Sequence, residues 1–290
     1  MPAGTAKMQT VNYLTRRSMV RHGALALVGG ALLTRAGWIE ASDLPLVRRI
    51  NLWHPALPAS FDGLRIVQIS DVHAGLFMPS ERLTRVRDLA EELRPDLIVF
   101  TGDQLDRREV DANLFVHGLA GIHAPLGVFG ILGNHDHLAG AALATAAIEA
   151  IDATPLVNHT AVLERDGARI GLVGLDDLDS PDGADFASIG STPADFRLVL
   201  CHQPRGWRRV RAAGGHVTLA GHTHGGQIAF PSQGVNLARL QGPYVAGPYL
   251  RPGAALYVSR GIGVGAVPLR LGAPPEIDLV TLRRGSLAAI

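Results

Sequence analysis

The chain has 290 residues, of which 47% are hydrophobic, so it is long enough to bury a full core in one large domain. Its 27 basic and 26 acidic residues nearly balance, which leaves no overall field for nucleic acid, and no nucleic-acid partner is expected. Cys201 is the only cysteine, which excludes an intrachain disulfide and a cysteine-rich structural zinc site. Any metal site must therefore be built from His, Asp, Asn and Glu.

The N-terminal stretch has the features of an export signal. Arg16 and Arg17 precede an apolar run from Gly23 to Leu33. The run is shorter than the ~20 residues that a membrane-spanning helix needs, but it suits the apolar centre of a signal peptide with a twin-arginine start. We predict that residues 1–41 form a signal or anchor segment and that residues 42–63 form a lead-in. The expected location is the periplasm or cell envelope, the expected partner is the twin-arginine export machinery, and retention of the segment would add membrane association.

From Leu64 onward the sequence alternates short apolar runs with helical patterns, which is typical of an α/β domain. Buried strands are predicted at residues 64–70, 97–101, 127–132, 196–201 and 216–220, a hairpin at 161–174, and further strands at 256–259 and 277–282. Helices are predicted to begin near Ser80 and to cover residues 113–119, 140–151 and 204–211. The acidic stretch 175–193 is interpreted as a solvated surface loop. Residues 64–290 are therefore predicted to form one domain.

Polar side chains follow five of these strands directly. Because the loops at the carboxyl ends of strands in an open α/β sheet converge on one crevice, we expect these side chains to lie close together. Taken one at a time, each has an ordinary explanation as a turn former or a capping residue, but their recurrence at five strand ends favours a common metal site. The candidate ligands are Asp71, His73, Asp103, Asn134, His202, His222 and His224.

The chemistry of the candidate ligands indicates two metal ions. Oxygen and imidazole ligands together suit Mn, Fe, Zn or Co, and this set is larger than one such ion needs. His222 and His224, two residues apart and flanked by glycines, also suggest two adjacent ions. Two ions about 3.5–4 Å apart can hold a bridging hydroxide, polarise a phosphoryl group and stabilise both the attacking and the leaving oxygen. The predicted reaction is therefore hydrolysis of a phosphoester.

The same residues fall in five motifs: Asp71-x-His73, Gly102-Asp103-x-x-Asp106-Arg107, Gly133-Asn134-His135-Asp136, His202 and Gly221-His222-Thr223-His224. In order and spacing they resemble the motifs of the calcineurin-like metallophosphoesterases, and the resemblance extends from about Leu64 to the C-terminus. It implies a four-layer α/β/β/α sandwich of two mixed sheets, with a dimetal site at the strand C-terminal ends. It also implies that the first ion is ligated by Asp71, His73 and His224, that Asp103 bridges both ions, and that the second ion is completed by Asn134, His202 and His222.

Further residues of these motifs are candidates for catalysis and substrate binding. The resemblance implies that His135 protonates the leaving oxygen or stabilises transition-state charge, and that Asp106 orients it. Histidine suits this proton transfer because its side chain titrates near neutral pH. Arg107 and Arg260 are candidates for binding the substrate phosphate, because guanidinium groups match phosphate oxygens; a solvated surface arginine is the alternative for each. No role is assigned to Asp136.

Within the family, the twin-arginine start, the stretch 222–227 and the stretch 257–263 resemble exported or membrane-associated bacterial phosphodiesterases. The sequence lacks a long inserted cap, which favours a broad or lipid-linked substrate. We therefore predict a phosphodiesterase of an envelope or lipid-linked substrate that uses two divalent ions, with manganese favoured, and His135 as the acid. One alternative is a UDP-diacylglucosamine-type pyrophosphohydrolase, whose cytoplasmic-face reaction conflicts with an export signal. Another is a non-catalytic metal-dependent envelope binding module, against which the presence of His135 and Asp106 argues.

Overall fold

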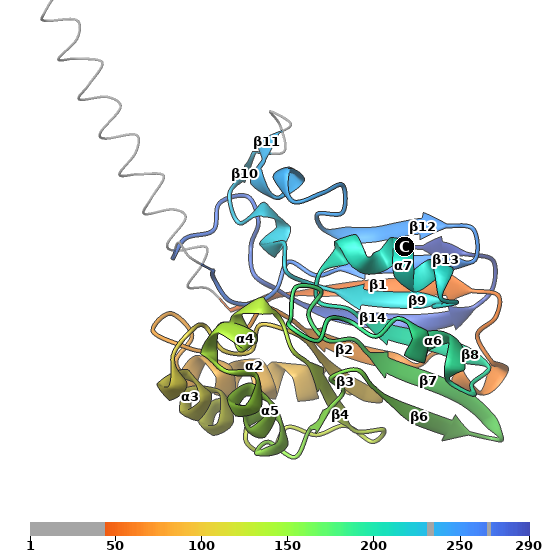
Figure 1. The fold of residues 1–290 in the computed structure, drawn as a ribbon, viewed down its shortest axis with the longest axis horizontal. Helices are drawn as coiled ribbons and strands as arrows, with labels where there is room; N and C mark the ends of the chain where they lie inside the picture. Colours follow the sequence, from red (N-terminus) through yellow and green to blue (C-terminus); the bar gives the residue numbers. More distant parts are fainter. Residues whose placement is uncertain (1–43, 231–234, 266–267) are drawn as a thin grey trace, which may run out of the picture.

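The structure, a computed structural model, describes residues 44–230, 235–265 and 268–290 (Figure 1). The predicted signal or anchor segment, residues 1–41, lies outside the described residues. Within the described part of the chain, no helix combines the length and apolar character that crossing a membrane requires.

The first of two mixed sheets contains seven strands in the order β15-β1-β14-β2-β3-β4-β5. Their bounds are β1 (Leu46–His54), β2 (Arg65–Ile69), β3 (Leu97–Thr101), β4 (Val128–Ile131), β5 (Thr154–Pro155), β14 (Glu276–Arg284) and β15 (Ala288–Ala289). Strands β2 to β5 run parallel, and β14 runs antiparallel to β2. Strand β1 lies parallel to β14, so the segment predicted as a lead-in contributes a strand to this sheet.

The second sheet contains six strands in the order β12-β13-β9-β8-β7-β6. Their bounds are β6 (His159–Arg165), β7 (Ala168–Gly174), β8 (Phe196–Leu200), β9 (Val217–Ala220), β12 (Gly247–Arg251) and β13 (Ala254–Val258), and a separate small ribbon joins β10 (Ala229–Phe230) to β11 (Val235–Asn236). The predicted hairpin is confirmed as β6 and β7. Its turn residues Asp166 and Gly167 have φ values of 51° and 76°, the positive values that a tight hairpin turn requires.

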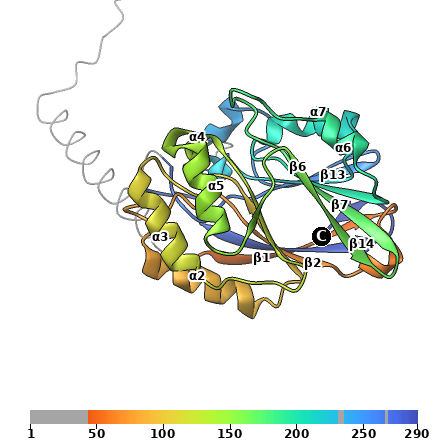
Figure 2. The ribbon, with the colours of Figure 1, turned by 60° about the horizontal axis from the view of Figure 1, so that its bottom comes forward.

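Helices cover the outer face of each sheet, so that the molecule has the predicted four layers (Figures 1 and 2). Three hydrophobic clusters fill the spaces between the layers. One packs the first sheet against its helices, a second lies between the two sheets, and a third packs the second sheet against its helices. The first group of helices is α2 (Ser80–Glu92), α3 (Glu109–Leu119), α4 (Asn134–Ala139) and α5 (Ala141–Glu149), and the second is α6 (Ala187–Ser191) and α7 (Trp207–Ala212).

The central strands read as continuous apolar runs because both of their faces are covered. All five residues of β3 and all four of β9 are buried, as expected for strands between two layers. The strands β2, β3 and β4 and the strands β8 and β9 each run parallel within their sheets, so their carboxyl ends meet loops on one side. These loops carry the candidate ligands.

Candidate metal centre

The candidate ligands sit on sharply bent backbone. Five of them have positive φ, the left-handed region that residues other than glycine rarely adopt. The values are 50° for Asp71, 45° for His73, 56° for Asp103, 71° for His222 and 51° for His224. Backbone strain of this kind costs about 1–3 kcal/mol per residue and persists where surrounding structure enforces it, commonly at functional sites. The strand ends therefore turn abruptly and direct the side chains inward.

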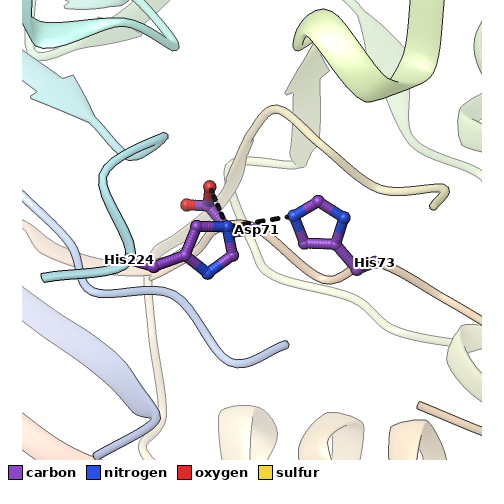
Figure 3. Close-up of side chains that lie close together, drawn as sticks. All are labelled: Asp71, His73 and His224. Atoms are coloured by element: carbon purple, nitrogen blue, oxygen red, sulfur yellow. Dashed lines mark hydrogen bonds and ion pairs between the residues drawn. The ribbon is translucent and has the colours of Figure 1, made fainter. Parts of the chain in front are cut away.

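The first group of side chains consists of Asp71, His73 and His224 (Figure 3). Nε2 of His73 lies 3.1 Å from Nε2 of His224, which in turn lies 3.5 Å from Oδ1 of Asp71. All three side chains are buried. The potential ligand atoms of the group lie within 4.8 Å of one another, close enough to share one ion.

The second group consists of Asp103, His202 and His222. Nε2 of His202 lies 3.2 Å from Oδ2 of Asp103 and 3.3 Å from Nδ1 of His222. The other ring nitrogen of His202 lies 2.8 Å from the carbonyl oxygen of Thr101, which fixes the orientation of the ring. Residues two apart in an extended strand share one face, but the positive φ values at His222 and His224 bend the chain and place the two imidazoles in different groups.

Asp103 belongs to the second group and also faces the first. Its Oδ2 is 3.6 Å from Nε2 of His73 in the first group and 3.2 Å from Nε2 of His202 in the second. Burial by itself would raise the pKa of Asp103, but the nearby His202 and His73 hold it well below its usual value. The carboxylate is therefore ionised and faces both groups, as a bridging ligand must.

Burial and the neighbouring charges set the protonation of the imidazoles. Burial lowers the pKa of His222 to about 3 and also lowers that of His224. Burial acts in the same direction on His202, but the Asp103 carboxylate outweighs it and raises the pKa of His202 to about 10. Burial likewise raises the pKa of Asp71. Burial therefore keeps His222 and His224 in the neutral form in which imidazole binds a metal, whereas His202, held protonated by Asp103, gives up its proton when it ligates an ion.

The remaining candidate ligand, Asn134, supports the fit to divalent ions. It is the first residue of α4, and its side-chain oxygen is buried and has no hydrogen-bond partner in the structure. An isolated buried acceptor is costly unless a ligand satisfies it. Amide oxygen, carboxylate and imidazole together suit transition-metal ions. All seven predicted ligands therefore lie at this edge with chemistry that fits divalent metals.

Two glycines allow the close approach of the ligands. A Cβ atom on Gly221 would lie 2.3 Å from Oδ2 of Asp71, and one on Gly102 would lie 2.4 Å from Nδ1 of His202. Both distances are far below contact, so only glycine fits at these positions. The backbone N–H of His222 then donates to both oxygens of Asp71, at 2.9 and 3.1 Å.

His135 and Asp106 lie next to the first group. Nδ1 of His135 is 2.8 Å from the carbonyl oxygen of Asp106 and 3.4 Å from its Oδ1. The same Oδ1 lies 3.5 Å from Nδ1 of His73. Asp106 therefore orients two imidazoles at once, one of them through its backbone.

The two predicted phosphate-binding arginines lie in different surroundings. Arg107 is exposed and lines a cleft of about 320 Å³ together with His73 and Asp106. Arg260 instead donates from Nη1 to the buried Glu276, at 3.1 Å. The structure thus leaves Arg107 open to a ligand and restrains Arg260. A second cleft of about 280 Å³ borders the other side of the centre and is lined by His222, Thr223, Gln203, Arg205 and Tyr244, among others.

Two buried residues that support the site were not found from the sequence. Both oxygens of Asp136 accept backbone N–H groups, from Leu105 at 2.9 Å and from Gly133 at 2.9 Å. An acidic residue in the first turn of a helix is a recognisable signal, so Asp136 could have been assigned this role. Arg270 is fully buried and donates to the carbonyl of Gly263 at 2.6 Å, with the same nitrogen 3.2 Å from Nδ1 of His224. No local pattern marks that arginine.

The interpretation of residues 175–193 as a solvated loop is wrong at its start. Asp176 and Asp177 are buried, at 5% and 2% exposure. Oδ1 of Asp176 lies 2.7 Å from Nε2 of His137, and its Oδ2 accepts from the hydroxyl of Ser180 at 2.8 Å. The loop therefore packs onto α4 beside the metal centre, because these contacts compensate for the loss of hydration.

A four-layer α/β/β/α sandwich with clustered oxygen and imidazole groups at one edge is the arrangement of a metal-dependent phosphoesterase. The chain matches the family described as Calcineurin-like phosphoesterase over residues 64–226. It is 34% identical to an uncharacterised metallophosphoesterase of Bacillus subtilis, YkuE, over 93% of this chain and 98% of that protein. It is 29% identical to UDP-2,3-diacylglucosamine pyrophosphatase LpxG of Chlamydia trachomatis, over 84% of this chain and 92% of that protein. The chain belongs to the calcineurin-like phosphoesterase family, whose members are hydrolases that use divalent metals.

Other similarities extend to larger proteins. A transmembrane protein with metallophosphoesterase domain from Danio rerio is 30% identical, and the match covers 91% of this chain and 63% of that protein. Among solved structures, the NAD nucleotidase of Haemophilus influenzae aligns with a TM-score of 0.44 and 16% identity, over 69% of this chain and 45% of that one.

Proposed function

We propose that the protein is a phosphodiesterase that binds two divalent ions, preferentially manganese, and hydrolyses an envelope or lipid-linked phosphoester. The observation that carries the proposal is that the two ligand groups meet at Asp103, while His135 lies beside them and belongs to neither. Asp71, His73 and His224 would hold the first ion, and Asn134, His202 and His222 the second, with Asp103 shared.

Two ions bound there supply a nucleophile derived from water and positive charge beside the phosphoryl oxygens. The chain itself supplies the proton. The backbone N–H of His135 donates to Oδ1 of Asp103 at 2.8 Å, and Nδ1 of its ring lies 2.8 Å from the carbonyl of Asp106. With Nδ1–H directed to that carbonyl, the proton for the leaving oxygen is carried on Nε2. His135 thus acts as the general acid and Asp106 orients it.

Arg107 and Arg260 bind the phosphate group of the substrate. Arg107 is exposed beside His73 and Asp106, so its guanidinium can grip a phosphate oxygen in the adjacent cleft. Arg260 is partly occupied by Glu276, so it contributes to phosphate binding through its remaining N–H groups. Glu276 also accepts from Arg48 at 3.2 Å, and the three side chains brace one another.

A specific observation also favours a second candidate, cleavage of a lipid-linked pyrophosphate. The relative from Chlamydia trachomatis carries the name of a UDP-2,3-diacylglucosamine pyrophosphatase, and it aligns along most of both chains. Both candidates use the same ligands and acid and differ in the group that leaves. The twin-arginine start supports an envelope location, which argues for a substrate other than a cytoplasmic nucleotide-linked lipid.

The proposal is tested with bis-p-nitrophenyl phosphate, a monoester, a nucleotide sugar and a lipid pyrophosphate in the presence of manganese. His135→Ala is expected to retain its metal but to lose about 10²–10⁴-fold in kcat on the preferred substrate, since general acid catalysis contributes that much. His117→Ala, which changes an exposed histidine on α3, serves as the matched control and should retain full activity. If metal-loaded wild type hydrolyses none of the four substrates, the proposed enzymatic function is wrong and the envelope binding module is favoured.

The envelope location has its own test. Replacing Arg16 and Arg17 by lysine is expected to retain the protein in the cytoplasm, which cell fractionation and immunoblotting would detect. An unchanged distribution between the cell fractions would exclude export by the twin-arginine route.

A further inference from the structure

Large apolar side chains are exposed mainly at one edge of the molecule. Eight of them are exposed within the described part of the chain. Leu240 is 88% exposed, Leu76 77% and Leu138 66%, so most of each side chain is open to solvent. Ile290 is 80% exposed but lies toward the other end of β1, where its N–H donates to the carbonyl of Asn51 at 3.0 Å. The others are Leu44, Leu46, Val110 and Val162.

Chain topology places the three most accessible leucines at the edge that carries the metal centre. Leu76 lies in the loop that follows β2 and His73, and Leu138 lies in α4, which begins at Asn134. Leu240 ends the short helix η5 (Leu237–Leu240), which packs beside η3 (His224–Gly226). The side chain of Asn236, just before η5, donates to the carbonyl of Gly225 at 2.9 Å.

The start of the described chain lies at the same edge. Strand β1 runs parallel to β14, and its first residue Leu46 is paired with Glu276. The N–H of Glu276 donates to the carbonyl of Gly261 at 3.0 Å, and a Cβ on Gly261 would lie 2.6 Å from Cβ of Asp71. The exposed Leu44 and Leu46 therefore emerge beside the candidate ligands. In Figure 1 this edge includes α3 and α4, whereas the hairpin that carries Val162 extends from the opposite side of the sheets.

Positive charge accompanies these apolar side chains. Arg49, Arg107 and Arg239 are exposed on the same segments: Arg49 lies three residues after Leu46, Arg107 follows Asp106, and Arg239 precedes Leu240. The cleft of about 320 Å³ joins the two kinds of surface, because Leu76 and Phe77 line it together with Arg107 and Arg108. Apolar side chains interspersed with arginine match the interface of an anionic bilayer, where acyl chains lie beneath negative headgroups.

The sequence ahead of the described chain limits how far this edge could lie from a membrane that held the apolar run. The apolar run 23–33 ends eleven residues before Leu44. At about 3.3–3.6 Å per residue, that connection spans at most roughly 40 Å. An apolar run held in a bilayer would therefore keep Leu44, and the edge at which it lies, within that distance of the lipid surface.

We propose that this edge, which we call the docking rim (Leu44, Leu46, Leu76, Leu138 and Leu240), rests on an anionic lipid surface. The cleft beside Arg107 then opens toward the headgroup layer and receives a phosphoester that is attached to lipid. The substrate class rests on the proposed function, whereas docking itself requires no turnover.

The test uses the full chain with single environment-sensitive fluorophores at Leu76→Cys and Leu240→Cys. Val162→Cys is the control, because Val162 is an exposed apolar residue, at 42%, at the far side. The native Cys201 does not interfere, since it is buried and burial raises the pKa of its thiol to about 12. Vesicles of phosphatidylglycerol and phosphatidylcholine in equal parts should shift the emission of the two rim labels to the blue and protect them from an aqueous quencher. The label at position 162 should not respond.

If neither rim label shows an emission shift or protection from the quencher, the proposal is wrong, even if the protein cosediments with vesicles through its N-terminal segment. An equal response at position 162 would overturn it as well. A label at Leu138→Cys should lose its shift in a Leu76→Asp, Leu240→Asp double variant and keep it when Val162→Asp is introduced instead. An unchanged emission shift in the double variant would contradict docking through the rim.

Hydrolysis of a soluble diester is measured on the unlabelled wild type, because Leu76 lines the cleft beside Arg107 and a label there could block the substrate. This measurement separates the two proposals. Turnover with silent rim labels would refute docking and leave the proposed function intact. Rim labels that respond in a metal-loaded protein without turnover on any substrate would support docking and refute the proposed function.

Discussion

Asp136 ties the loop after β3 to the start of α4, and removing it should destabilise the protein measurably. Its two oxygens accept the N–H groups of Leu105 and Gly133, each at 2.9 Å, and its side chain is fully buried. Asp136→Ala leaves both donors buried without a partner. Each such donor costs about 1–3 kcal/mol, so the free energy of unfolding should fall by about 2–6 kcal/mol. Asp136→Asn keeps one acceptor oxygen and should lose about 1–3 kcal/mol.

The measurement is urea unfolding, followed by circular dichroism, with a chelator present so that metal binding does not contribute. A pH of about 8 is suitable, because burial and the neighbouring Asp103 raise the pKa of Asp136 to about 7 and the carboxylate then predominates. Asp88→Ala on the surface of α2 is the control and should change stability by less than about 0.5 kcal/mol.

The same substitution should weaken the second metal position. Asp136 fixes the loop that follows Asp103 and the turn that carries Asn134, so its loss should reduce affinity for the second ion by about 10–100-fold, as for other residues that orient ligands. Isothermal titration with manganese would measure this change. The reasoning fails if Asp136→Ala is no more destabilising than Asp88→Ala, or if the asparagine variant loses as much stability as the alanine variant.

Two further predictions concern histidines. His224→Ala should deplete chiefly the first ion and His222→Ala chiefly the second, so metal analysis should find about one ion per chain in each, and electron paramagnetic resonance should show loss of the coupled manganese pair; equal loss of both ions in each variant would remove the split assignment. Burial lowers the pKa of His216 to about 4 in the folded protein. As pH falls, the unfolded chain therefore binds a proton at this histidine before the folded protein does. The stability that neutral His216 contributes is present above pH ~6.5 and is lost as pH falls toward 4. After allowance for its partial exposure, wild type should lose about 1 kcal/mol more than His216→Gln between pH 7 and pH 5 in urea unfolding, and parallel losses would contradict the shift.

Much of the fold was predictable because it is encoded in short stretches. Fully apolar runs such as Leu97–Thr101 predict strands covered on both faces, and Asp166-Gly167 predicts a hairpin turn. Strand β1 was missed because its sequence, LVRRINLWH, is neither continuously apolar nor strictly alternating. Its place is decided by pairing with β14, which lies 230 residues further along the chain in the register Leu46 to Glu276.

The candidate site, like the fold, has features that the sequence predicts and features that it does not. The sequence by itself determined which side chains end the strands, since the polar residue after each apolar run is visible without a structure. Only the tertiary structure decided how they combine: the N–H of His222 reaches Asp71 across 151 positions, Glu276 restrains Arg260, and the buried Arg270 lies against His224. These contacts depend on two sheets packing face to face and on left-handed turns at the strand ends. Local sequence patterns carry neither, because both arise from long-range packing.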